Sequence, residues 1–335
     1  MFSDYGQRVV EERIPQVRRF NRVVTQRAGA LDDAFLARGR PLGQARVLWE
    51  IGPEGADIRT LRNRLGLDSG YLSRVLAALA ADGLVVVRPS ETDRRVRTAR
   101  LTRAGLAERA ELDRRNDAVA SSILEPLGEA QRARLVEAMA VVERLLTASM
   151  IRLQPCDPRH PHARSSLGSY FAELAARFDG GFDIDRANPD DPSDLVPPAG
   201  LLLVATLNGE PVGCGALRHH DVRRGAPHWS EIKRLWVAPT VRGAGLGRRL
   251  LVALEQRAAA AGARTVRLDT NRVLTEAITM YRAEGYREIP AFNDNPYAHH
   301  WFEKRLAPGG PRRGQARAAS TRSTNAVSGT APAQA

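Results

Sequence analysis

The chain has 335 residues, of which 43% are hydrophobic and 26% are charged, and its net charge is +12. This composition argues against a mostly disordered or fibrous chain, and the length allows about two domains. No apolar run reaches the ~18 residues of a membrane-spanning helix, so no membrane partner is expected. The N-terminal residues lack the apolar core of a secretory signal, and the two cysteines, Cys156 and Cys214, make no disulfide framework. We therefore expect a cytoplasmic protein.

The first 150 residues show the apolar periodicity of a helical domain. Apolar residues recur at helical spacing in the segments 7–27, 42–49 and 57–65. A fourth helix is expected between Asp68, a helix-capping residue, and Gly83. These segments predict a pair of helices joined by a short turn, an arrangement that many DNA-binding proteins use.

Two β-like runs, residues 84–88 and 96–102, follow this helix pair and are joined by a polar turn. The segment 88–103 contains six arginines and two acidic residues, which gives a local charge of +4. Helical sequence continues to about residue 150, with a break expected at Pro126 because an internal proline loses a backbone donor. Two helices followed by a two-stranded ribbon predict a winged helix-turn-helix.

The second helix of such a pair enters the DNA major groove with its N-terminal side chains leading. Arginines at a ribbon tip suit the minor groove, where the phosphate field is strongest. A solvated charged hairpin beside an ordinary helical corner remains the alternative when each feature is taken alone. The candidate DNA-binding residues are Ser69, Tyr71, Ser73, Arg74, Asp93, Arg94, Arg95 and Arg97.

The stretch 67–85, followed by Asp93-Arg94-Arg95-Val96 and by Leu101-Thr102-Arg103-Ala104-Gly105, resembles the MarR family of transcriptional regulators. The resemblance covers about residues 7–148 and implies a homodimer formed by the helices at the two ends of that region. It also implies binding to a pseudo-palindromic double-stranded DNA operator, with the two recognition helices about one DNA turn apart.

Residues 151–307 alternate between strand and helix patterns. The expected strands are 201–206, 211–217, 230–237, 265–269 and 299–306, and the expected helices begin at Gly245 and span 273–283. Asn208-Gly209 joins the first two strands and is a strong signal for a two-residue hairpin turn. The last 28 residues, 308–335, carry four arginines and no acidic residue, and we expect a disordered basic tail there.

A glycine-rich loop, residues 242–247, lies between an expected strand and a long amphipathic helix. Backbone N–H groups at a helix N-terminus suit a diphosphate, and glycines let the backbone approach it. Counted from Gly243, the third glycine of a dinucleotide fingerprint would fall at Arg248, and the Gly-Lys-Ser/Thr of a P-loop is absent. A glycine-rich turn without a ligand remains the alternative.

Arg242, Gly245 and Gly247 match the Arg/Gln-x-x-Gly-x-Gly/Ala acyl-CoA loop, and Ala277-x-x-x-Tyr281-x-x-x-Gly285-Tyr286 follows downstream. These motifs and the order of elements resemble the GNAT acetyltransferases. The resemblance implies an α/β fold with a mixed, mostly antiparallel sheet, acetyl-CoA as co-substrate without a metal, and direct attack by an amine in a ternary complex. The candidate acetyl-CoA-binding residues are Leu235, Trp236, Val237, Arg242, Gly243, Ala244, Gly245, Leu246, Gly247, Arg248, Asn271 and Tyr281.

Acetyl transfer needs a neutral amine, a polarised thioester carbonyl and a proton for the leaving thiolate. By the resemblance, Tyr281 matches the general acid of the family, and a packed aromatic residue is the alternative. Glu231 is the candidate general base, directly or through water, with a strand-edge ion pair as the alternative. A backbone N–H near Val237 is expected to contact the acetyl carbonyl oxygen. Asn271 is expected either to bind the pantetheine arm or to form a turn.

The sequence thus predicts a MarR-like winged-helix domain over 1–150 and a GNAT acetyltransferase domain over 151–307. We expect a bifunctional transcriptional regulator and N-acetyltransferase that acts on a small-molecule or peptide primary amine. Two alternatives stay open. In the first, the second domain is a catalytically silent sensor of an acyl-CoA or an amine. In the second, the protein is an enzyme whose helical half serves for dimerisation alone.

Overall fold

The structure is a computed structural model. It describes residues 2–27, 39–90, 93–184, 186, 191–220 and 229–306. The predicted tail, 308–335, lies outside the described residues. No helix in the described part of the chain is long and apolar enough to cross a membrane.

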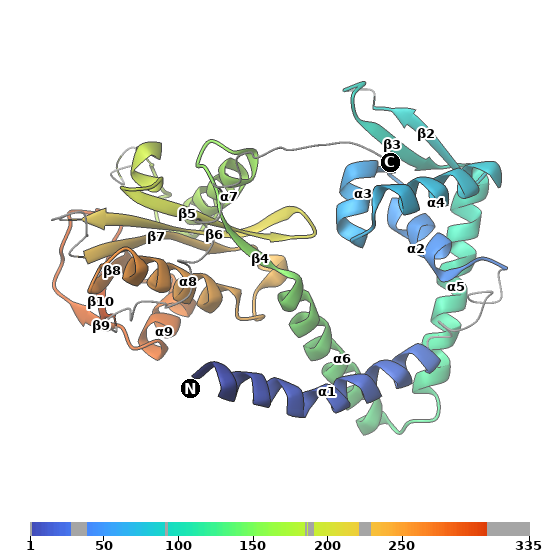
Figure 1. Cartoon of the computed structure of the whole chain (residues 1–335), viewed down its shortest axis with the longest axis horizontal. Helices are drawn as coiled ribbons and strands as arrows, with labels where there is room; N and C mark the ends of the chain where they lie inside the picture. Colours follow the sequence, from blue (N-terminus) through green and yellow to red (C-terminus); the bar gives the residue numbers. More distant parts are fainter. Residues whose placement is uncertain are drawn as a thin grey trace, which may run out of the picture. The chain divides into compact units, whose positions relative to one another are not determined.

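The N-terminal part is a set of helices with a small three-stranded sheet (Figure 1). The helices are α1 (Phe2–Arg27), α2 (Leu42–Ile51), α3 (Ile58–Leu65), α4 (Ser69–Ala81), α5 (Arg103–Leu124) and α6 (Glu129–Met150). The strands are β1 (Ala56–Asp57), β2 (Val85–Pro89) and β3 (Arg97–Leu101), arranged antiparallel in the order β1-β3-β2. The winged helix-turn-helix expected from the sequence is present, and the expected break near Pro126 separates α5 from α6.

Side-chain caps explain where three of these helices begin. The Asp57 carboxylate accepts from the Thr60 N–H at 2.8 Å, and the Asp68 carboxylate accepts from the Tyr71 N–H at 2.8 Å. The Thr102 hydroxyl accepts from the Gly105 N–H at 3.0 Å. Each cap satisfies one of the N–H groups that a helix leaves without an internal partner.

Helix α4, the second helix of the pair, is anchored by one apolar face. Leu72, Val75, Leu76 and Leu79 are buried and pack with residues of α2, α3 and the strands. A β-carbon at Gly105, at the start of α5, would collide with the carbonyl oxygen of Leu84. Only glycine lets α5 approach the wing this closely, so the wing is held at a set position on the helical core.

The C-terminal part is a seven-stranded sheet with helices on it. The strands are β4 (Arg152–Pro155), β5 (Gly200–Leu207), β6 (Glu210–His220), β7 (Trp229–Val237), β8 (Thr265–Thr270), β9 (Arg287–Ile289) and β10 (His300–Arg305). The helices are α7 (Pro161–Arg177), α8 (Leu246–Ala260) and α9 (Thr275–Ala283), with short 3-10 turns at Pro192–Leu195 and Pro239–Val241. The strand order is β4-β5-β6-β7-β8-β10-β9. The pairing of β7 with β8 is parallel, and β8–β10, β10–β9 and β4–β5 are antiparallel, so the predicted mixed, mostly antiparallel sheet is confirmed.

Strand β1, with two residues, was not expected from the sequence patterns, and neither were strands β4 and β9. Strands β4 and β9 are also short, with four and three residues, so all three strands contain too few positions to show an alternating pattern.

Strands β7 and β8 separate part-way along their length. They pair only over Trp229–Glu231 and Thr265–Arg267, although β7 continues to Val237 and β8 to Thr270. Arg234 has a φ of 54°, in the left-handed region that side-chain-bearing residues rarely adopt. The left-handed backbone at Arg234 interrupts the regular extended conformation of β7 beyond the residues that pair with β8.

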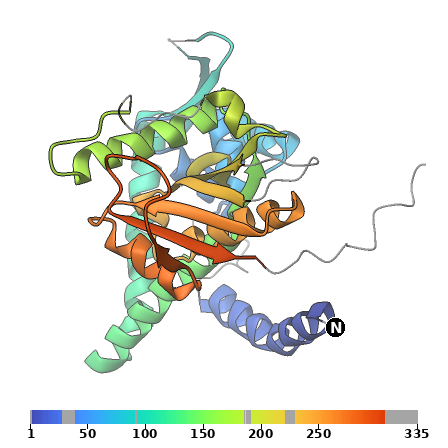
Figure 2. The same ribbon diagram turned by 90° about the vertical axis from the view of Figure 1, so that its left-hand side faces the viewer.

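Helices α8 and α9 cover one face of this sheet (Figures 1 and 2). Leu250, Leu251 and Leu254 of α8 are completely buried, as is Phe302 of β10. Successive strand residues point to opposite faces, so Trp301 and Asp269, which are paired in register, lie on the face opposite Phe302. The sheet therefore has an apolar face toward α8 and α9 and a second face that carries polar and aromatic side chains.

Candidate functional site

The predicted DNA-contacting face of α4 is exposed. Ser69, Tyr71, Ser73 and Arg74 are all exposed, and the apolar residues between them are buried. Tyr71 is 36% exposed, and its hydroxyl lies against Gly43 at the start of α2. The N-terminal half of α4 thus presents hydroxyls and a guanidinium to the outside, which is what a major-groove helix requires.

The wing tip is a tight turn with exposed basic side chains. The Asp93 carboxylate accepts from the Arg95 N–H at 2.9 Å, and the Asp93 carbonyl accepts from the Val96 N–H at 2.9 Å. Arg94, Arg95 and Arg97 are all exposed. Asp93 therefore shapes the turn, and the arginines are the groups available to phosphates.

The glycine-rich loop has a backbone conformation that favours glycine at two positions. Gly243 and Gly245 have φ values of 77° and 76°, which other residues adopt only with strain. A β-carbon at either position would meet no atom within 4 Å, so the space beside the loop backbone is open. The N-terminal N–H groups of α8, beginning at Leu246, have no intrahelical partners. This combination fits the diphosphate of acetyl-CoA.

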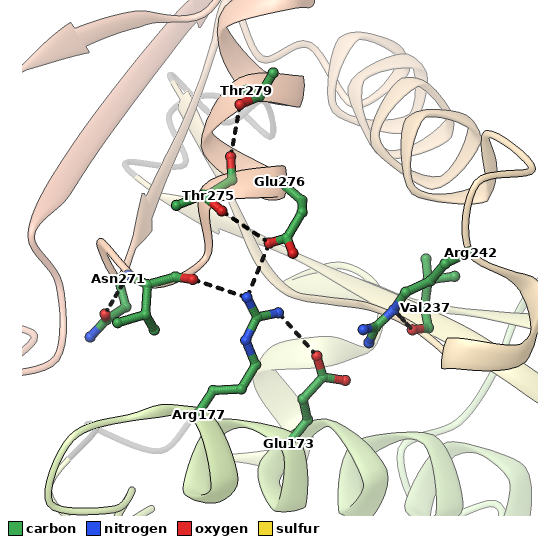
Figure 3. Close-up of polar contacts among 9 residues, drawn as sticks. Glu173, Arg177, Val237, Arg242, Asn271, Thr275, Glu276 and Thr279 are labelled. Atoms are coloured by element: carbon green, nitrogen blue, oxygen red, sulfur yellow. Dashed lines mark hydrogen bonds and ion pairs between the residues drawn. The ribbon is translucent and has the colours of Figure 1, made fainter.

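Two arginines flank this loop and differ in their contacts. The Arg242 side chain donates through Nε to the Val237 carbonyl oxygen at 3.0 Å (Figure 3). Arg248 forms an ion pair with Glu284, with Nε and Oε1 2.6 Å apart. Arg242 therefore braces the end of β7, and Arg248 joins the start of α8 to the chain just after α9. Of the predicted acetyl-CoA residues on β7, Trp236 is buried and Leu235 and Val237 are half-buried.

Glu231 lies at the point where β7 and β8 separate, and it is almost completely buried. Its carboxylate is 3.0 Å from His220 Nε2 and 3.9 Å from Lys233 Nζ. The His220 ring stacks on Trp229, with ring centroids 4.0 Å apart. The alternative for Glu231 was an ion pair with Lys233 or Arg234 at a strand edge. Lys233 is a distant partner, the nearest partner is His220, which sequence analysis placed in no site, and Glu231 is buried.

A second carboxylate, Asp269 of β8, lies beside Glu231 and was missed by sequence analysis. Asn293 donates to Asp269 Oδ2 at 2.6 Å and to Glu231 Oε1 at 3.5 Å. Asn295 donates to Asp269 Oδ1 at 3.0 Å. Asn293 and Asn295 lie shortly before the last strand, and this pair of asparagines was the sequence signal that could have indicated the site. On its own the signal predicts a turn equally well, because asparagine is common in turns.

Tyr281 is buried in α9, where its ring packs near Tyr286 and Phe302 with centroids 5.8 and 5.9 Å away. Burial raises the pKa of the Tyr281 hydroxyl, and the negative charge of Asp269 raises it further. A phenol with a raised pKa keeps its proton at neutral pH, which suits a proton donor and not a base. Tyr281 is therefore a packed aromatic residue, and this packing is compatible with a role as general acid.

Asn271 has the geometry of a turn-forming residue. Its side-chain oxygen accepts from the Val273 N–H at 3.0 Å, and its Nδ2 donates to the Tyr297 carbonyl oxygen at 2.8 Å. The Val273 carbonyl oxygen in turn accepts from Arg177 at 2.9 Å, and Arg177 also pairs with Glu276 (Figure 3). Of its two expected roles, the turn-forming one is the role that these contacts support.

Aromatic side chains from the segment after α7 surround Tyr297. Phe178 and Phe182 lie 5.8 and 4.8 Å from the Tyr297 ring centroid, and Phe182 also stacks on Phe171 at 5.9 Å. The Arg234 guanidinium lies 5.5 Å from the Phe171 ring centroid. This aromatic group ties the end of α7 to the loop that carries Asn293 and Asn295. No group of three or more histidine, cysteine or acidic side chains in the described ranges is placed to hold a metal ion.

Comparison with known proteins bears on both halves of the chain. The model of the Acetyltransferase (GNAT) family matches residues 169–286, and the model of the MarR family matches residues 38–96. An aminoalkylphosphonate N-acetyltransferase of Salmonella typhimurium is 30% identical over 134 residues, which are 40% of this chain and 86% of that protein. The chain belongs to the GNAT acetyltransferase family. It carries a MarR family domain in front of the GNAT domain.

Two further proteins illustrate the similarity of the GNAT domain. An IAA acetyltransferase of Azospirillum brasilense is 38% identical over 107 residues, and the match spans 32% of this chain and 66% of that protein. A GNAT family acetyltransferase of Elizabethkingia anophelis, solved with acetyl-CoA bound, is 20% identical and has a TM-score of 0.33. That comparison covers 47% of this chain and 99% of the other.

Proposed function

We propose that the protein is a DNA-binding transcriptional regulator and an N-acetyltransferase that transfers acetyl from acetyl-CoA to a primary amine. The reaction is direct attack in a ternary complex. The amine nitrogen forms a bond to the acetyl carbon, and the carbon–sulfur bond breaks toward the thiolate. The observation that carries this proposal is the buried Glu231 at the point where β7 and β8 separate. The open, left-handed glycine backbone of the 242–247 loop supports it.

In this proposal each part of the site has one task. Glu231 takes the proton of the ammonium group, Tyr281 supplies a proton to the leaving thiolate, and the N-terminus of α8 holds the diphosphate. The exposed face of α4 and the arginine wing contact DNA. Exposed apolar side chains on the terminal helices support a homodimer, and DNA as partner together with the two free cysteines supports a cytoplasmic location.

The catalytic half of this proposal is tested by thiol release from acetyl-CoA across a panel of primary amines and lysine peptides, with wild type and Glu231→Gln. Glutamine keeps the shape of glutamate and can hydrogen-bond, but it takes no proton from an ammonium group. We expect turnover with one class of amine and a loss of kcat/KM on the order of 100-fold in Glu231→Gln.

Acetyl-CoA affinity, measured by calorimetry, should be the same for both proteins, since Glu231 has no part in holding the diphosphate. Binding of acetyl-CoA without turnover on any amine would exclude the enzyme and leave the silent sensor. Equal turnover by wild type and Glu231→Gln would exclude Glu231 as the base while keeping the enzyme.

A further inference from the structure

Of the 50 lysine and arginine residues in the chain, only Lys233 and Lys304 are lysines. The two residue types differ in chemistry, because a lysine ammonium group can lose a proton and become a nucleophilic amine, whereas a guanidinium keeps its charge. Lys233 and Lys304 are therefore the only side-chain primary amines in the sequence. A primary amine is the group that the proposed reaction acetylates.

Lys304 lies on the face of the sheet that packs against α8 and α9. It follows the buried Phe302 by two residues on β10, so both side chains point to the same face. Lys304 Nζ donates to the two carboxylate oxygens of Glu255 at 2.9 and 2.7 Å, and it lies 5.4 Å from the Tyr286 ring centroid. These contacts make Lys304 a structural residue that ties β10 to α8.

Lys233 lies on the other face of the sheet, beside the proposed base. It follows Glu231 by two residues on β7, so the two side chains leave the strand on the same face. Lys233 Nζ is 3.9 Å from Glu231 Oε1, and the Lys233 side chain is 23% exposed. Burial raises the pKa of Asp269, and the positive charge of Lys233 opposes this rise, which places Lys233 near both carboxylates.

Along β7, Lys233 lies between the proposed base and the expected position of the thioester. Glu231 is the last residue of β7 that pairs with β8, and the backbone near Val237, where the acetyl carbonyl oxygen is expected, is at the end of the strand. The opening between the two strands thus begins beside Lys233. The four-carbon stem of lysine is flexible, so Nζ can turn from Glu231 toward this opening.

We propose that Lys233 is a site of self-acetylation, at which the protein transfers acetyl from its own bound acetyl-CoA to Lys233 Nζ. This inference rests on the proposed function, because it uses the same donor and the same base. The ammonium group gives one proton to Glu231, and the freed electron pair of Nζ forms the bond to the acetyl carbon. The carbon–sulfur bond breaks with its electron pair on sulfur, which takes a proton from Tyr281. The second proton that the nitrogen loses restores Tyr281, so the products are N-acetyl-lysine, the free thiol and one proton on Glu231.

The test is mass spectrometry of the full chain after incubation with acetyl-CoA that carries a deuterated acetyl group, with no other amine present. Deuterium distinguishes new acetyl groups from any that the purified protein already carries. We expect one labelled acetyl group per chain, located on Lys233 by peptide mapping. Lys233→Arg should take up none, because arginine keeps the charge and offers no such amine. Lys304→Arg is the matched control, and Lys233 should be labelled in it as in wild type.

Glu231→Gln separates this reaction from spontaneous acetylation by acetyl-CoA. The variant keeps Lys233 and loses the proposed base, so labelling of Lys233 should slow by about 100-fold. Tyr281→Phe, which lacks the proposed proton donor, is a second variant in case Glu231→Gln does not fold, and it should slow the labelling as well. Unlabelled acetyl on Lys233 of purified wild type supports the inference if the purified slow variant lacks it.

A mixture of two variants shows whether the transfer occurs within one chain. When Glu231→Gln is mixed with Lys233→Arg, the only Lys233 belongs to the chain that lacks the base. It should stay unlabelled, because the base of one chain acts on the lysine of the same chain. Labelling of Lys233 in this mixture at the wild-type rate would overturn self-acetylation.

The inference is also overturned if Lys233 of folded wild type carries no acetyl group, if Lys233 and Lys304 are labelled equally, or if labelling of Lys233 persists unchanged in Glu231→Gln. Turnover on external amines decides separately on the proposed function. Acetylation of an external amine with Lys233 unmodified would leave the proposed function standing and the inference wrong. Acetylation of neither would remove both. Acetylation of Lys233 alone would support the inference and give the acetyltransferase its own chain as acceptor.

Discussion

At the scale of single residues, the two tyrosines of the second GNAT motif have different surroundings. The Tyr286 hydroxyl donates to Glu255 at 3.0 Å, and the same carboxylate pairs with Lys304 at 2.7 Å. Tyr281, five residues earlier and within α9, makes no hydrogen bond through its hydroxyl to any described residue and lies in the field of Asp269. Tyr286 is thus a structural anchor between β10 and α8, and Tyr281 is the phenol with an uncommitted proton.

This contrast leads to a matched pair of variants. Tyr281→Phe should lower kcat about 10- to 100-fold, because it removes the proton donor for the thiolate, and should leave the Kd of acetyl-CoA within about 2-fold. Tyr286→Phe should keep kcat and lower the free energy of unfolding by about 1 kcal/mol, since it removes one buried hydrogen bond. Steady-state kinetics, calorimetry and denaturant melts measure these effects. Equal kinetic losses in both variants would contradict a specific role for Tyr281.

At the scale of elements, the winged helix and the split strand are each set by a few backbone positions. The wing is joined to α5 at Gly105, where no side chain fits against the Leu84 carbonyl oxygen. Strand β7 leaves β8 after Glu231 and has a left-handed backbone conformation at Arg234. The close approach at Gly105 holds the ribbon that carries the wing arginines. The separation of β7 from β8 places the Glu231 carboxylate at the opening between two parallel strands.

The wing predicts how DNA binding depends on salt. Each arginine that contacts a phosphate contributes about one to the slope of log K against log salt. Arg94→Ala/Arg95→Ala should therefore weaken binding to mixed-sequence duplexes and lower the slope by about two for each wing in contact with DNA. Fluorescence anisotropy from low to moderate salt measures both.

The control is Arg257→Ala/Arg305→Ala, which removes two exposed arginines from the GNAT domain and has the same change in net charge. If both double variants reduce the slope equally, the wing has no special part in binding. If neither does, the regulator half of the proposed function is lost.

At the scale of the whole molecule, the terminal helices carry apolar surface that the described chain does not cover. Val17, Val23, Leu145 and Leu146 are 55%, 59%, 60% and 58% exposed. Monomeric proteins rarely leave large apolar side chains grouped on helices in this way, and such groups mark interfaces. A second copy of the chain is the partner that the winged-helix half requires if it is to read a two-fold symmetric operator.

The dimer is tested by sedimentation or light scattering. Wild type should have twice the 36.7 kDa mass of one chain, and Leu145→Glu/Leu146→Glu should shift it to the monomer because two charges would be buried at the interface. Ile184→Glu, at an exposed apolar position outside these helices, should remain dimeric. A monomeric wild type would contradict the predicted dimer, and operator binding would then need a different explanation.

Most elements of this fold were predictable because their signals are local. Asp57 and Asp68 mark helix starts, Asn208-Gly209 marks a hairpin with φ values of 54° and 87°, and the 242–247 loop has its motif in six consecutive residues. Each of these signals depends only on residues a few positions apart in the chain, so it can be recognised in the sequence alone. Strand β9 was not predictable in this way, because three residues show no period.

The sequence by itself therefore determined the two families, the order of the main elements, the glycine-rich loop 242–247 and the candidates Glu231 and Tyr281. Only the tertiary structure decided what surrounds Glu231. Its neighbours His220, Asp269 and Asn293 come from positions 11, 38 and 62 residues away in the chain. Which of them meet depends on the register of β8 and β10 and on the point where β7 departs. Register and strand separation arise from packing between distant segments, and no local pattern encodes them.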